Sequence, residues 1–416
     1  MINYDFTTLS NGIRVVSEFT PHYKSFSMGF WFDVGSRDES INENGISHFI
    51  EHMLFKGTTK RTSKQITDAI ESSGGYINAF TSKEQICIYV RGLEEYFEKY
   101  FDVLSDMIQN PLFKESHIKK EAGVVIEELN DIEDNPEELI FDKFETELFK
   151  GNSLANPIIG TIENIKSFNS ESLIKFIKKY FTTNNLVISV SGSIKHEKIL
   201  KLVESKIIGL EIGEPIKRKS LNKIFSRDVF IHKETNQIYT ILGTDTFGFN
   251  DKRRLQIKVL STLLGENSGS KLFQAVREKY GMAYQINTFL NSYIDVSSFG
   301  IFFSTNETNW EKANKIVLKQ LNDIKNGKIT ENHLKQVKRY IKGSMILGLE
   351  NTTNRMMGLA HSLFHYGRIM EVEEILSNLE SITSKEIIDS ANNVFADGKL
   401  IQVIIANKNL LNTKAA

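Results

Sequence analysis

The chain has 416 residues, of which 40% are hydrophobic, 10% aromatic and 25% charged. This composition is typical of a globular protein and excludes a disordered chain, a collagen-like repeat and a disulfide-rich scaffold, while the length suggests two domains or more. Lys and Arg number 51 and Asp and Glu 52, so the net charge favours neither nucleic acid nor an anionic membrane as a partner.

The single cysteine, Cys87, cannot form an internal disulfide bond and lies in a strand-like run. We interpret it as a small buried hydrophobic residue in a reducing compartment, in preference to a catalytic thiol. No apolar run is long enough to span a membrane, and the first residues lack the basic and apolar regions of a signal peptide. We therefore expect a cytoplasmic protein without a membrane partner.

Strand-like and helix-like segments alternate along the chain. A turn signal at Asn11-Gly12 precedes the first strands, and Gly57 and the Gly74-Gly75 pair stand where helices should end. In chain order, the pattern predicts strands at 13–16 and 27–34, helices at 45–55 and 63–73, strands at 77–80 and 85–91, and helices at 95–109 and 115–132.

The second half of the chain repeats this order. It predicts strands at 285–287 and 298–303, a helix at 310–324, and another helix that begins after Thr330. The segment 113–119 also resembles the segment 329–335, displaced by 216 positions. We interpret the pattern as an internal duplication that gives an α+β fold of two sandwich-like domains, each a mainly antiparallel sheet with helices.

The boundary between the two halves is predicted at residues 211–225. This segment contains Gly213, Pro215 and the basic run 217–219, which are typical of a linker. The predicted domains are therefore residues 1–210 and 226–416.

The segment His48-Phe49-Ile50-Glu51-His52 is the most informative one for function. On a helix, His48, Glu51 and His52 share one face, and two imidazoles four residues apart can bind one zinc ion. The carboxylate between them can then reach a water on the metal, as in the H-x-x-E-H motif. The alternative is a pair of ordinary helix histidines, which is how we interpret His361 and His365, because no carboxylate is in register with them.

Helix periodicity nominates a third metal ligand. In the helix at 115–132 the apolar positions step by four and three, and Glu121 and Glu128 both lie beside this stripe, whereas Glu127 should face water. Half-buried carboxylates are costly unless a cation neutralises them, so a metal would explain both. Salt bridges to nearby lysines are the alternative at this point.

The segment His48 to Thr58 resembles the signature of the M16 family of zinc metallopeptidases, which includes pitrilysin, insulin-degrading enzyme and mitochondrial processing peptidase. In that family the two histidines bind zinc, the intervening glutamate is the general base, and a third ligand follows the second histidine by some 76 residues. Counted from His52, that position is Glu128. The family's supporting glutamate lies seven residues earlier, at Glu121, although Ala122 stands where relatives often have a basic residue. Length and duplication are most similar to the short bacterial, processing-peptidase-like members.

Two further segments extend the resemblance. Gly75 to Ser82 is similar to the family's edge strand that pairs with the peptide substrate, which implies main-chain contacts from Asn78, Ala79 and Phe80. In the second half, Gly269 to Tyr284 is similar to a segment whose Arg and Tyr contact substrate, here Arg277 and Tyr284.

The resemblance implies a zinc-dependent endopeptidase with one Zn²⁺ per chain, in which His48, His52 and Glu128 bind the metal and Glu51 acts as general base on zinc-bound water. It implies that Glu121 supports a histidine ligand, and that the two domains form a clamshell around peptides or unfolded polypeptide, with a homodimer as the assembly. The second half has no H-x-x-E-H motif, so that domain should bind no metal. The alternative function is a non-catalytic peptide-binding or scaffold subunit. A purely structural zinc site is weaker, because it would normally need four protein ligands, often Cys.

Overall fold

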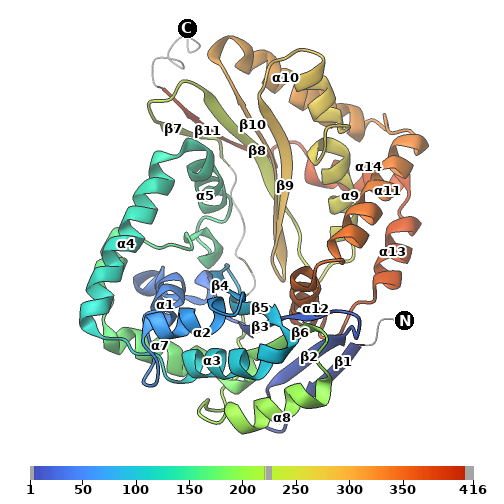
Figure 1. Ribbon diagram of the computed structural model, residues 1–416. Coiled ribbons are helices and arrows are strands. Elements are labelled where there is room, and N and C mark those ends of the chain that lie inside the picture. Colours follow the sequence, from blue (N-terminus) through green and yellow to red (C-terminus); the bar gives the residue numbers. More distant parts are fainter. Residues whose placement is uncertain (1–3, 220, 222–226, 408–416) are drawn as a thin grey trace. The chain divides into compact units, whose positions relative to one another are not determined.

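The computed structural model describes residues 4–219, 221 and 227–407, which form two compact units. The first unit contains residues 1–129, 156–219 and 347–369, and the second contains 130–155, 220–346 and 370–416. Both units combine one sheet with helices, which confirms the predicted mixed fold of two sheets with helices. Figure 1 labels most elements of both units.

The first unit contains a six-stranded sheet in the order β1-β2-β6-β3-β5-β4. All neighbouring strands are antiparallel except β2 and β6. Its strands are β1 (Tyr4–Thr8), β2 (Arg14–Phe19), β3 (Ser25–Phe32), β4 (Tyr76–Thr81), β5 (Ile86–Leu93) and β6 (Leu186–Gly192). Its helices are α1 (Ile46–Leu54), α2 (Ser63–Glu71), α3 (Phe97–Gln109), α6 (Ile162–Ser167), α7 (Ser170–Tyr180), α8 (His196–Lys206) and α12 (Thr352–Tyr366), and most of α4 (Glu115–Asp134) belongs here.

Helices cover both faces of this sheet because the residues of its central strand are buried on both sides. Alternate side chains of β3 point to opposite faces. Phe26 and Phe30 contact Phe97 and Phe101 of α3, whereas Trp31 belongs to a core cluster with residues of α12. Helices α1 and α2 pack against β4, so the predicted H-x-x-E-H helix lies beside the edge strand of the sheet.

The second unit contains a five-stranded sheet in the order β7-β11-β8-β10-β9. Helix α5 packs on one face of it, while α9, α10 and α14 contribute to the core on the other. The strands are β7 (Val229–His232), β8 (Ile238–Phe247), β9 (Gln285–Ser292), β10 (Val296–Thr305) and β11 (Ile401–Ala406). The helices are α5 (Pro136–Leu148), α9 (Arg254–Gly265), α10 (Glu307–Lys325), α11 (Glu331–Gly348, whose last residues group with the first unit), α13 (Val372–Ser381) and α14 (Ser384–Val394).

The two sheets have the same topology. The order β2-β6-β3-β5-β4 in one corresponds to β7-β11-β8-β10-β9 in the other, and in each sheet only the first of these pairs is parallel. The similar segments displaced by 216 positions begin α4 at Glu115 and α11 at Glu331. The predicted strands and helices are all present, with ends that differ by a few residues. The strands β1, β6, β7, β8 and β11 and the helices α5 to α9 and α12 to α14 were not predicted.

The boundary between the units at 219/220 falls inside the predicted linker 211–225, of which residues 220 and 222–225 lie outside the described residues. Residues 130–155 come from the first half of the sequence but group with the second unit. Residues 347–369 come from the second half but group with the first unit. The division into functional domains at 1–210 and 226–416 stays a prediction.

Candidate metal centre

Helix α1 presents a polar face because its apolar residues are needed on the other side. Its fully buried residues include Ile46, Phe49, Ile50 and Met53, which anchor it in the core of the first unit. This anchoring fixes the rotation of the helix. His48, Glu51 and His52 are therefore directed away from the core, as the periodicity predicts.

Helix α4 supplies two carboxylates to the same place. Buried Ile118, Val125 and Leu129 set its phase, which leaves Glu127 exposed and Glu128 half-exposed. A carboxylate oxygen of Glu128 lies 3.7 Å from Nε2 of His48, and its other oxygen lies 3.5 Å from Nε2 of His52. Within the described ranges, these three side chains form the one group of His, Cys, Asp or Glu close enough to hold a metal ion.

The geometry and chemistry of this group fit zinc. Four ligands at about 2.0–2.1 Å from a tetrahedral zinc ion lie about 3.3 Å from one another. The separations of 3.5 and 3.7 Å, which involve different oxygens of Glu128, are close to this value, and one ligand atom from each residue lies within 4.8 Å of the others. Two imidazoles and one carboxylate are also a donor set of catalytic zinc sites, which leave one position open.

Glu121 is hydrogen-bonded to one of the two imidazoles. Its carboxylate is buried, accepts a hydrogen bond from Nδ1 of His52 at 2.9 Å and forms an ion pair with Nζ of Lys56 at 2.7 Å. A proton on Nδ1 leaves the lone pair of Nε2 free for a metal. The Nδ1 atom of His48 is also buried, but it has no hydrogen-bond partner among the described residues.

The surroundings of the two imidazoles shift their pKa values in opposite directions. Burial and the neighbouring charge of His52 lower the pKa of His48 to about 4, so its nitrogen stays unprotonated. Burial also opposes the charge on His52, but hydrogen bonds to Glu121 and Glu128 outweigh it and raise the pKa to about 9. A metal must therefore displace a proton from His52, and its affinity should fall as the pH falls.

Glu51 lies between the ligands and the edge of the sheet. The Thr81 hydroxyl, on β4, donates a hydrogen bond of 2.6 Å to Oε2 of Glu51. Burial raises the pKa of Glu51, and this hydrogen bond opposes the shift. The carboxylate is thus fixed at one oxygen while the other remains available to accept a proton.

Comparisons with known proteins place the chain in a family. A family model described as insulinase, peptidase family M16, matches residues 14–162, and one described as the inactive domain of peptidase M16 matches residues 167–341. An uncharacterized zinc protease of Rickettsia felis is 33% identical over 396 residues, which are 95% of each chain. The chain belongs to peptidase family M16.

Other relatives of this M16 chain agree in length and fold. The uncharacterized zinc protease YmxG of Bacillus subtilis is 33% identical over 97% of this chain and 98% of its own. The crystal structure of a protease from Helicobacter pylori superposes with a TM-score of 0.90 at 21% identity, over 97% of this chain and 99% of that one. The names of the Rickettsia felis and Bacillus subtilis relatives support use of zinc, and the Helicobacter pylori structure shows the same fold. No helix in the described part of the M16 chain is long and apolar enough to cross a membrane.

The other predicted site residues lie on β4, in the helical turn Phe273–Glu278 and directly before β9. Asn78, Ala79 and Phe80 are part of β4, which is an outer strand of its sheet. Arg277 and Tyr284 belong to the second unit, where the guanidinium of Arg277 lies 5.4 Å from the centre of the Tyr284 ring, and Tyr284 is 74% exposed. The structure brings these two side chains together. Their action on a substrate stays a prediction, as do the roles of the other site residues.

Sequence reasoning missed two residues of the site. Thr81 and Lys56 both fall within the quoted motifs, but no role was predicted for either. Lys56 follows His52 by four residues, and Thr81 follows Ala79 by two and therefore shares its face of β4. Both spacings were visible in the sequence. His361 and His365 lie outside the site, on α12, where their rings stack 5.6 Å apart and His361 packs against Trp31.

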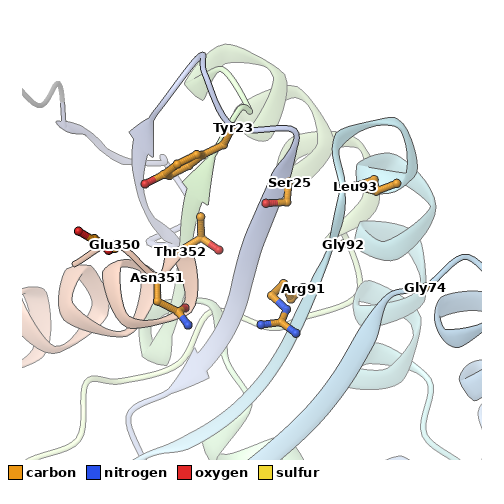
Figure 2. A pocket seen from close by; sticks show the side chains of 9 residues that line it. All are labelled: Tyr23, Ser25, Gly74, Arg91, Gly92, Leu93, Glu350, Asn351 and Thr352. Atoms are coloured by element: carbon orange, nitrogen blue, oxygen red, sulfur yellow. The ribbon is translucent and has the colours of Figure 1, made fainter. Parts of the chain in front are cut away.

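A separate polar pocket of about 370 Å³ lies in the first unit (Figure 2). Arg91 of β5 and Asn351, which caps α12, extend into it from opposite sides. It contains none of the predicted metal ligands, so we assign it no part in the metal centre.

Proposed function

We propose that this protein is a zinc-dependent endopeptidase that hydrolyses peptides or unfolded polypeptide segments. The observation that carries the proposal is the convergence of His48, His52 and Glu128 on one point, with the carboxylate of Glu51 held beside them at the edge of a sheet. Zinc at this point would supply a Lewis acid that polarises a peptide carbonyl and lowers the pKa of a water molecule to about 7. One zinc per chain is expected.

The residues of the chain have distinct parts in this proposal. Thr81 holds Oε2 of Glu51, so Oε1 is the oxygen that accepts a proton from the attacking water and then passes it to the departing amine. Burial raises the pKa of Glu51, which makes its carboxylate a better proton acceptor than an exposed glutamate. Glu121 keeps the proton of His52 on Nδ1.

The substrate is proposed to bind as an added strand. In the part of the chain that the structure describes, β4 pairs only with β5, so its other edge has no partner strand. A peptide in extended conformation would form hydrogen bonds with the main chain of Asn78, Ala79 and Phe80. Arg277 and Tyr284 are proposed to contact this peptide, and a homodimer is proposed from the family resemblance.

The test compares the wild type with Glu51→Gln on a library of quenched unstructured peptides, together with the zinc content of each protein. We expect both proteins to bind one zinc and only the wild type to cleave, with loss of cleavage on chelation. Because Glu51 is not a ligand in the proposal, loss of zinc from the variant would contradict its role. If neither protein cleaves although both bind zinc, the alternative of a peptide-binding subunit is favoured.

A further inference from the structure

The N-terminus of α1 needs hydrogen-bond acceptors that its own residues do not supply. The first N–H groups of a helix have no partners within the helix. The residue before α1 is Gly45, whose φ of 98° suits glycine, and a Cβ atom there would lie 2.6 Å from the carbonyl oxygen of Ile159. A capping side chain is therefore excluded at this position, and α1 has no cap of its own.

Glu39 supplies the missing acceptors from outside the helix. One carboxylate oxygen accepts a hydrogen bond of 2.8 Å from the backbone N–H of Ser47. The other accepts one of 2.8 Å from the N–H of Gly45 and one of 3.0 Å from the side-chain amide of Asn44. The carboxylate is buried, and Ser47 directly precedes His48.

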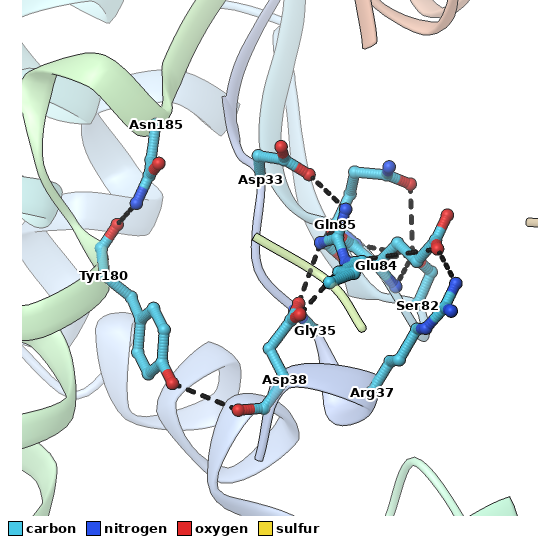
Figure 3. A network of polar contacts seen from close by, with 10 residues as sticks. Asp33, Gly35, Arg37, Asp38, Ser82, Glu84, Gln85, Tyr180 and Asn185 are labelled. Atoms are coloured by element: carbon cyan, nitrogen blue, oxygen red, sulfur yellow. Dashed lines mark hydrogen bonds and ion pairs between the residues drawn. The ribbon is translucent and has the colours of Figure 1, made fainter. Parts of the chain in front are cut away.

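The loop that carries Glu39 is itself held by a network of ion pairs, shown in Figure 3. Arg37 pairs with Glu84 at 2.6 Å. Arg218 pairs with Asp38 at 2.8 Å and with Asp33 at 2.9 Å, and it also donates to the carbonyl oxygen of Glu84. Residues 33–38 are thus fixed directly before Glu39, from which the carboxylate reaches α1.

We propose that Glu39 is a positioning residue for the metal centre, which sets the first turn of α1 so that His48 and Glu51 face Glu128. The proposal rests on the proposed function. His48 depends on the helix for its orientation, because no described residue bonds its Nδ1 atom, whereas Glu121 bonds that of His52. Ligands must lie within about 0.5 Å of their productive positions, so a small shift of the first turn weakens the site.

Glu39→Gln is the sharpest variant, because it preserves size but replaces one acceptor oxygen with an NH₂ donor. That donor would face an N–H group of the helix or the amide of Asn44, all of which also donate. Burial raises the pKa of Glu39 to about 7. The measurements are therefore made at pH 8, where the wild type carries the carboxylate.

The experiment measures three quantities for the full chain. Zinc affinity is obtained by competition with a chromophoric chelator, ligand geometry from the visible absorption of the Co²⁺-substituted protein, and kcat and KM from peptide cleavage. For Glu39→Gln we expect zinc binding and kcat to fall about tenfold, an altered Co²⁺ spectrum and an unchanged KM, because β4 is not disturbed. Glu39→Asp, which keeps the charge but is shorter, should fall between the wild type and Glu39→Gln.

A matched control separates positioning from general stability. Val203 is fully buried in α8, which packs against β2 and α3, so Val203→Ala should lower the unfolding temperature and leave zinc affinity and kcat intact. The proposal is overturned if Glu39→Gln binds zinc as tightly as the wild type, or if Val203→Ala loses as much affinity at an equal loss of thermal stability.

The outcomes also distinguish this inference from the proposed function. If the wild type binds zinc without cleaving peptides, the proposed function fails, and zinc affinity and the Co²⁺ spectrum still decide the role of Glu39. A wild type that binds no zinc would overturn both.

Discussion

Replacement of Glu121 tests how much a residue that is not a ligand contributes to metal binding. Its carboxylate joins His52, at 2.9 Å, to Lys56, at 2.7 Å, and is only 3% exposed. Burial would raise the pKa of this carboxyl, but the hydrogen bonds from His52 and Lys56 outweigh burial and hold the pKa below its usual value. The ionised form is therefore the one that the site stabilises.

The size of the effect follows from these two contacts. A hydrogen bond to a charged group contributes about 1.5–3 kcal/mol. In Glu121→Gln the remaining oxygen can face only one partner, and we expect it to stay with His52, because the ammonium of Lys56 is one-third exposed and can turn to water. His52 then keeps an acceptor but loses its negative charge, so the loss should be near the lower limit, about tenfold in zinc affinity at 1.36 kcal/mol per factor of ten. Glu121→Ala loses both contacts and should cost about a hundredfold.

The assay is a zinc titration against a competing chelator, with Glu127→Gln as the control. Glu127 lies on the same helix and its replacement removes the same charge, but it is exposed and outside the metal site. We expect zinc affinity to decrease in the order Glu127→Gln, Glu121→Gln, Glu121→Ala. Equal affinities for the Glu127 and Glu121 variants would refute the argument that Glu121 orients His52.

The remaining predictions concern a ligand, a substrate contact and a buried histidine. Glu128→Gln should weaken zinc binding at least tenfold in the same titration while Glu127→Gln does not, because only Glu128 faces His48 and His52; the reverse result would mean that the wrong glutamate is assigned. Arg277→Ala should reduce kcat/KM about tenfold or more at unchanged zinc content, and an unchanged rate would remove its proposed role. Burial lowers the pKa of His361, so below about pH 6.5 the unfolded chain binds more protons and stability falls with falling pH. Denaturant unfolding of His361→Phe should show a slope smaller by up to about 1.4 kcal/mol per pH unit, and an unchanged slope would contradict this account.

The parts of the site that could be predicted from the sequence are those that local periodicity encodes. The shared face of His48, Glu51 and His52 follows from the helical repeat, and the buried stripe of α4 distinguishes Glu128 from Glu127 without any tertiary information. The strand β1 was missed although Tyr4 to Thr7 alternates apolar and polar side chains, because it is a short outer strand whose residues are all exposed or partly exposed.

The parts that could not be predicted depend on contacts between distant segments. The basic run 217–219 was interpreted as part of a linker, yet Arg218 binds Asp33 and Asp38, which precede it by about 180 positions. Glu39 lies in an irregular loop, and no repeat indicates that its carboxylate reaches the N–H groups of α1. A basic run and a loop glutamate have the same local pattern whether they face water or a buried partner.

The duplicated topology also indicates whether this fold needs a metal ion for its stability. Helix α9 follows β8 and packs against the outer strand β9, as α1 follows β3 and packs beside β4. The sequence of α9, RLQIKVLSTLLG, contains no His, Cys, Asp or Glu, so the second unit forms the same sheet and helix arrangement without metal donors at this place. The second unit thus forms without metal donors on this helix, and we expect the first unit to fold without its metal as well. We expect a chelator to abolish activity while the circular dichroism of the protein is unchanged, whereas unfolding on chelation would indicate a structural zinc site.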